Sequence, residues 1–96
     1  MISEKIKNNG ELHKGYIVGM KIIYSTIGYF DLYLNVFFDG NVHIVIDNSF
    51  IDYYEIISKR HRLENTNVFV KGIPVDVYTK KGSIYLDLDS ISIEEV

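Results

Sequence analysis

The chain has 96 residues, of which 47% are hydrophobic, and it carries a formal net charge of −3 and no cysteine. This length supports one domain with a single core, and the composition is that of a folded globular protein rather than a disordered one. The lack of cysteine excludes a disulfide framework, a cysteine-ligated zinc site and a thiol nucleophile, which suits a cytoplasmic protein. The acidic balance argues against tight phosphate binding without excluding it, because local patches matter more than totals.

The N-terminal stretch, residues 1–11, mixes charges of both signs with few apolar residues. It is predicted to be a flexible tail or a short helix, followed by a single domain over residues 12–96. This start is too charged for a signal peptide, and no apolar run approaches the roughly 18 residues that a spanning helix needs. We therefore expect no membrane partner.

The stretch from Leu12 to Tyr24 is rich in residues that favour strands. Both of its alternating sets are substantially apolar, and Ile17 and Ile23 lie in the second of them. This pattern predicts a long strand that serves two sheets or bends across a barrel corner. Gly15 and Gly19 are the predicted positions of the bend or bulge.

Residues 29–47 predict a β-hairpin around which the rest of the chain is organised. Asp39-Gly40-Asn41 is its turn, because glycine, aspartate and asparagine tolerate positive φ. The first strand alternates between an apolar set, predicted to face the core, and a mixed set, predicted to face outward. The core-facing set is Phe30, Leu32, Leu34, Val36 and Phe38, and the outward set is Tyr29, Asp31, Tyr33, Asn35, Phe37 and Asp39. On the second strand, Val42, Ile44 and Ile46 are assigned to the core side, and His43 and Val45 to the outer side.

The period then changes to that of a helix, predicted over Phe50–Asn65 with Asn48 or Ser49 as its cap. Two further strands follow. The first covers residues 67–79, where Gly72 and Pro74 predict a bulge or an edge. Lys80-Lys81-Gly82 is the next hairpin turn. The last strand, Ser83–Ile93, needs a bulge near Asp89-Ser90 to keep its later apolar residues facing inward.

Five strands with one helix between the third and fourth, in the order β-β-β-α-β-β, is the layout of the OB-fold barrel. The chain resembles the small OB domains of replication protein A and its archaeal single-strand-binding relatives over roughly residues 12–93. The residues that carry this resemblance are Ile17-Val18-Gly19, Asp39-Gly40-Asn41, Val68-Phe69-Val70-Lys71-Gly72, Tyr78, Gly82, Tyr85-Leu86 and Ile91. The fold class predicted is therefore all-β with one helix, a five-stranded OB-fold barrel. An SH3-like barrel is the competing fold, but such barrels lack a helix of three to four turns.

Tyr33 and Phe37 flank Asn35 on the predicted outer face of the hairpin. In OB domains that bind single strands, aromatic residues on this face stack on bases. The alternatives are that both rings lie under a loop or a terminus, or in a protein interface. His43 and Val45 are expected to cross from the neighbouring strand, and Lys21 and Ile23 from the first strand are expected to complete the patch.

Lys80 and Lys81 lie in the loop that closes over the groove of OB folds, where they would contact phosphates, although solvated turns commonly contain lysine. The basic run 59–62 is a second candidate phosphate contact, but cations at a helix C-terminus need no ligand to explain them. His13, His43 and His61 have no metal-site spacing. Asp87 and Asp89 are read as solvated edge charges. No catalytic motif is present, so we expect neither an enzyme nor a cofactor.

Two functions remain open at this point. The first is a non-enzymatic protein that binds single-stranded DNA or RNA through Tyr33, Asn35, Phe37, His43, Lys21, Lys80 and Lys81. The second is an assembly subunit that acts through protein contacts without binding nucleic acid. The apolar second face expected on the first strand favours a homodimer or a larger protein partner.

Overall fold

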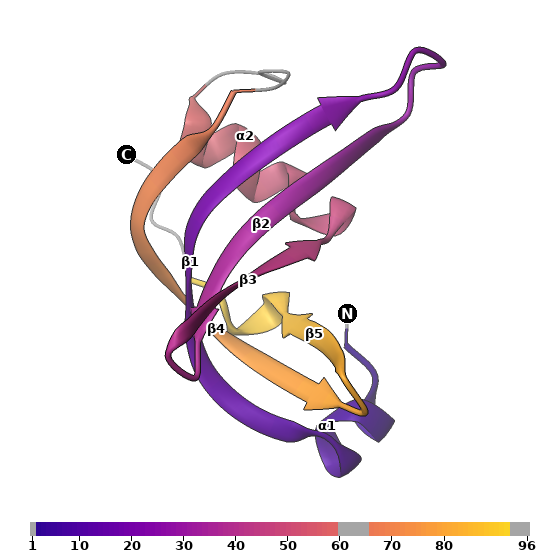
Figure 1. Cartoon of the computed structure of the whole chain (residues 1–96), viewed down its shortest axis with the longest axis vertical. Helices are drawn as coiled ribbons and strands as arrows, with labels where there is room; N and C mark the ends of the chain where they lie inside the picture. The colour runs from indigo at the N-terminus through magenta and orange to yellow at the C-terminus, as the bar shows by residue number, and fades with distance from the viewer. Residues whose placement is uncertain (1, 60–65, 93–96) are drawn as a thin grey trace.

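The structure is a computed structural model that describes residues 2–59 and 66–92 (Figure 1). Its elements in chain order are α1 (Glu4–Asn9), β1 (Glu11–Tyr24), β2 (Phe30–Phe38), β3 (Asn41–Ile46), the 3-10 turn η1 (Asn48–Phe50), α2 (Ile51–Ser58), β4 (Val68–Lys80), β5 (Ser83–Asp87) and the 3-10 turn η2 (Leu88–Ser90).

All five strands form one antiparallel sheet in the order β3-β2-β1-β4-β5, curled into a half-barrel with α2 between β3 and β4 (Figure 1). This confirms the predicted fold class, an OB-like all-β architecture with the order β-β-β-α-β-β. The N-terminal stretch forms the short helix α1, the second of its two predicted alternatives.

The long strand β1 is the centre of the sheet, because it pairs with β2 on one side and with β4 on the other. Its pairing shifts between Ile17 and Gly19, which leaves Val18 in a bulge, as expected near Gly19. The bulge changes which residues face inward, so that Ile17 and Met20 are both buried. The predicted second apolar face of β1 is therefore wrong at Ile17, which belongs to the core, and Ile23 is half-buried.

The β2–β3 hairpin has the predicted turn, with positive φ at Asp39 and Gly40. All five residues assigned to the core side of β2 are buried or packed against the core. The phase predicted for β3 is wrong. A two-residue turn pairs Phe38 with Asn41, so each odd-numbered residue of β3 shares a side with an even-numbered residue of β2. His43 therefore pairs with the core residue Val36 and stacks on Phe38, their ring centres 4.1 Å apart.

The core is closed at one end by η1 and α2, whose Phe50 and Tyr54 are fully buried. Asp47 caps η1 by accepting a hydrogen bond from the Ser49 N–H, a role that the sequence assigned to Asn48 or Ser49. The helix ends at Ser58, followed by Lys59 in a left-handed conformation. The rest of the predicted helix, including His61 and the basic run after Lys59, lies outside the described residues.

The β4–β5 hairpin has the predicted turn, with positive φ at Lys81 and Gly82. Strand β5 ends at Asp87, where the turn η2 takes the place of the bulge predicted near Asp89-Ser90. Asp87 is not a solvated edge charge, because only 6% of it is exposed. Its carboxylate accepts from the Asp89 N–H and lies 3.5 Å from the ammonium of Lys7 on α1. This contact ties the N-terminal helix to the end of the sheet.

The Lys7–Asp87 ion pair predicts a loss of stability at high pH. The charge of Asp87 raises the pKa of Lys7 above its ordinary value of about 10.4. A lysine with a raised pKa in the folded state stabilises the fold fully below its unfolded pKa, and this contribution disappears as the pH rises through the folded pKa. We expect wild type and Lys7→Met to differ in unfolding free energy by a constant amount between pH ~7 and ~10 and by less above this range.

Urea denaturation across this pH range measures that difference. Lys5→Met is the matched control, because Lys5 is exposed on the same helix. A Lys7→Met difference that stays constant up to pH ~11.5 would contradict the role given to this ion pair.

Candidate functional site

The side of the sheet that faces away from the core carries large apolar and aromatic side chains from four adjacent strands. We refer to the part of this side that the following ten residues form as the outer face. Its members are Tyr16, Lys21 and Ile23 of β1, Tyr33, Asn35 and Phe37 of β2, Val42, Ile44 and Ile46 of β3, and Phe69 of β4.

The strand register arranges these residues in three rows across the sheet. The first row is Lys21, Tyr33 and Ile46; the second is Phe69, Gly19, Asn35 and Ile44; the third is Tyr16, Phe37 and Val42. Side chains of directly paired residues lie on the same side of a sheet, about 5 Å apart. Each row is therefore a continuous band of neighbouring side chains.

These side chains are not needed to fill the core. Leu32, Leu34 and Val36 alternate with the outward residues of β2 and are fully buried on the opposite side. By contrast, 81% of Phe69 and 69% of Ile44 remain exposed. Large apolar groups gathered on one face in this way mark binding surfaces more often than scattered exposed residues do.

The second row of the outer face contains a glycine, Gly19, which has no side chain to project from the sheet. A Cβ atom at Gly19 would lie 3.0 Å from the Asn35 side-chain nitrogen, so Asn35 occupies the space next to it. Beside it, a depression is lined by Lys21, Ile23, Tyr33, Asn35, Ile44 and Asn67. Two amides, a phenol and an ammonium thus accompany the apolar side chains, and they can hydrogen-bond to bases or to phosphates.

The structure brings four of the sequence-predicted site residues together: Lys21, Tyr33 and Asn35 line the depression, and Phe37 lies one row away. It does not bring His43 to this face. The His43 ring faces the core side, and its Nε2 atom is buried without a hydrogen-bond partner. Lys80 and Lys81 lie at the β4–β5 turn and do not line the depression.

Sequence reasoning missed Tyr16, Phe69 and the outward residues of β3. The signal for β3 was available, because a two-residue turn fixes which side each residue takes. Phe69 stands between Val68 and Val70 in a segment with period two, so its outward position could also have been predicted from the sequence. Tyr16 joins the face because the bulge at Val18 changes the facing of β1. The sequence predicts a bulge near Gly19, but not which residues it turns outward.

Comparison with known protein families, curated proteins and solved structures finds no match to this chain. Within residues 2–59 and 66–92, no cluster of histidines and carboxylates could hold a metal ion. In the same part of the chain, no helix has the length and apolar character to cross a membrane.

Proposed function

We propose that this protein is a non-enzymatic OB-like module that binds single-stranded nucleic acid on its outer face. The observation that carries the proposal is the convergence of four aromatic rings from three strands: Tyr16, Tyr33, Phe37 and Phe69. Stacking of a base on an aromatic side chain is worth about 1–3 kcal/mol and tolerates any sequence.

Stacking, rather than phosphate contact, supplies most of the binding free energy in this proposal. Within the described residues, Lys21 is the one cation that lines the depression, and Lys14 on the same side of β1 is already paired with Asp76. The exposed Asp31 pairs with Ile23 close by. With a net charge of −3, the whole chain adds no long-range attraction for phosphates. Binding should therefore depend weakly on salt, with one or two phosphate contacts each contributing about 0.7 to the slope of log affinity against log salt.

The test is fluorescence anisotropy with labelled single-stranded DNA and RNA of roughly 12 nucleotides, a length within the known range of OB site sizes. We expect saturable binding that weakens less than about tenfold between ~50 and ~200 mM salt. A duplex of the same sequence should bind more weakly, because its bases are already stacked on one another. No binding of either single strand at low salt would refute the proposal.

The Lys21 ammonium is expected to account for most of the salt dependence. Lys21→Ala should lower the salt slope by about 0.7 through the loss of one phosphate contact. Lys81→Ala removes the same charge at the β4–β5 turn, outside the depression, and serves as the matched control. A salt slope lowered by Lys81→Ala and unchanged by Lys21→Ala would place the phosphate path at the turn instead.

A second candidate function is protein assembly through the outward residues of β3. Val42, Ile44 and Ile46 are 58%, 69% and 53% exposed and form an uncharged column beside β2. Contiguous apolar surfaces of this kind often mark protein interfaces. Light scattering separates the two candidates, because assembly through this column predicts a mass above that of one 11.1 kDa chain without any oligonucleotide.

A further inference from the structure

Strands β3 and β5 end the sheet on its two sides, and within the described residues neither has a partner strand on its outer edge. The two-residue turns fix which backbone groups face those edges. Odd-numbered residues of β3 bond to β2, as the Asp47 N–H does to the Leu32 carbonyl at 3.0 Å. The even-numbered residues of both strands therefore present N–H and C=O groups to the open edges. They are Val42, Ile44 and Ile46 of β3, and Ile84 and Leu86 of β5.

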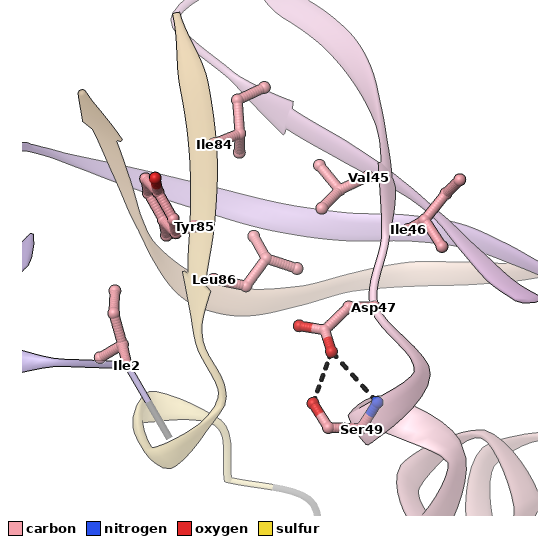
Figure 2. A pocket seen from close by; sticks show the side chains of 8 residues that line it. All are labelled: Ile2, Val45, Ile46, Asp47, Ser49, Ile84, Tyr85 and Leu86. Carbon is pink, nitrogen blue, oxygen red and sulfur yellow. Dashed lines mark hydrogen bonds between the residues drawn. The ribbon is translucent and has the colours of Figure 1, made fainter. Parts of the chain in front are cut away.

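Two clefts run along the space between these edges, which we refer to as the seam. One cleft is lined by Ile2, Val45, Ile46, Asp47, Ser49, Ile84, Tyr85 and Leu86 (Figure 2). The other is lined by Glu11, His13, Phe38, Asp39, His43, Thr79, Gly82 and Ile84. Ile84 lines both, so the clefts adjoin. Figure 2 shows Val45 of β3 and Leu86 of β5 on facing sides of the first cleft, so apolar side chains from both strands line the seam.

The β3 edge lacks the features that normally prevent unwanted strand pairing. Natural edge strands carry charges, prolines or bulges that block the addition of another strand. Residues Asn41–Ile46 include no charged residue and no proline, and β3 pairs with β2 without a register shift. An edge strand without these features is suited to pairing with a strand of another chain.

The charges along the seam indicate what that strand is. Among the described residues, the side chains that line the two clefts include three carboxylates, those of Glu11, Asp39 and Asp47, and no lysine or arginine. Because β5 bounds the seam on the side opposite β3, the space favours a single extended segment over a second folded domain. Charge complementarity then favours a basic segment.

We propose that the seam binds an extended, basic peptide segment of another protein, which adds to the β3 edge as a further strand. Its alternate side chains, small and apolar, rest on Val45, Ile84 and Leu86, and its lysine or arginine side chains approach the three carboxylates. Main-chain hydrogen bonds supply affinity in such strand addition, and side-chain pockets supply specificity. This site uses a strand edge and the inner side of the sheet, so it does not depend on the function proposed for the outer face.

The probe is a labelled peptide of about eight residues that alternates lysine and valine, within the usual length of a strand. A glutamate–valine peptide of equal length is the charge control. Backbone amide exchange, read residue by residue by NMR, should slow at Val42, Ile44 and Ile46 when the lysine–valine peptide is added. The glutamate–valine peptide should give no such protection. Two N-methylated lysine–valine peptides, one methylated at its valines and one at its lysines, each lose the donors on one edge. Addition to the β3 edge predicts that one of the two binds at least about fivefold more weakly than the unmethylated peptide.

Ile44→Pro tests the edge from the protein side. It removes an N–H that faces the open edge, so the β2–β3 ladder keeps all of its bonds. It should weaken binding of the lysine–valine peptide by about fivefold or more. Ile44→Thr keeps that N–H while shortening the same outward side chain, and its affinity for this peptide should stay within about twofold of wild type.

Three outcomes would overturn the proposal: equal effects of Ile44→Pro and Ile44→Thr, no protection of the three β3 amides at saturating peptide, or equal binding of the two peptides. Protection of these amides that rises with protein concentration alone would assign the edge to a second copy of this chain. Should Ile44→Pro fail to fold, the N-methylated peptides still decide the question, because unchanged binding of both would overturn the proposal.

Discussion

Phe69→Ala and Phe37→Ala are each expected to weaken the binding of a single-stranded oligonucleotide by about 5- to 150-fold, the effect of losing one stacked base. Phe69 is 81% exposed and Phe37 projects away from the fully buried Leu34 and Val36. Neither ring is part of the core. The free energy of unfolding should therefore change by about 0.5 kcal/mol or less in Phe69→Ala, the more exposed of the two. Anisotropy titrations, with urea denaturation of the same samples, measure both quantities.

The matched control for these variants is Ile56→Ala, which truncates a partly exposed apolar side chain on α2, outside the outer face. Its affinity for the oligonucleotide should equal that of wild type. Wild-type affinity in both phenylalanine variants would show that the rings do not stack on bases. If the oligonucleotide still bound, its site would lie elsewhere, and the assembly function would become the better account of the outer face.

Of the two glycines in β1, Gly15 is expected to give the larger loss of stability when it is replaced by valine. A Cβ atom at Gly15 would lie 2.9 Å from the Phe37 carbonyl oxygen and 3.1 Å from both Phe38 Cβ and Val77 Cγ2. Backbone and buried side chains surround it on all of these sides, so the sheet itself must move. Overpacking costs about 1–3 kcal/mol and sometimes more, and we expect about 3 kcal/mol or more here. The total free energy of unfolding of a typical domain is only about 5–15 kcal/mol, so this loss would be a large part of it.

Gly19→Val is the control on the same strand. The nearest atom to a Cβ there is the Asn35 side-chain nitrogen at 3.0 Å, which can rotate away, and the next lies at 3.5 Å. We expect a cost below about 1.5 kcal/mol. We also expect weaker oligonucleotide binding, because the displaced Asn35 side chain lines the depression. Urea denaturation of both variants checks the contrast. Equal destabilisation at the two positions would mean that the close packing at Gly15 is not what limits the fold.

The sequence predicted those parts of the fold that depend on local rules. The alternation of β2 and the turns at Asp39-Gly40 and Lys81-Gly82 all follow from side-chain period and from residues that tolerate positive φ. The end of α2 was less predictable. The apolar pattern continues beyond Ser58, whereas Lys59 adopts a left-handed conformation that no pattern of side chains announces.

Two long-range features were not predicted. A bulge was expected near Gly19, but its effect on side-chain facing depends on how β1 meets β2 and β4 at once, and it moves Ile17 into the core and Tyr16 onto the outer face. The facing of β3 was misread because its apolar residues were assumed to face inward, although they lie outward beside β2. Half of the candidate site was therefore predictable, namely Lys21, Ile23, Tyr33, Asn35 and Phe37, and the other half needed the strand register.

Chemical-shift mapping tests the central claim most directly. The isotope-labelled chain is titrated with an oligothymidylate of about eight nucleotides at low salt. The ring and amide signals of Tyr16, Tyr33, Phe37 and Phe69 should shift together along one saturable curve, while those of α1 remain unchanged. Shifts confined to the β3 and β5 edges, or no shifts at saturating oligonucleotide, would contradict the assignment of the outer face to single-stranded nucleic acid.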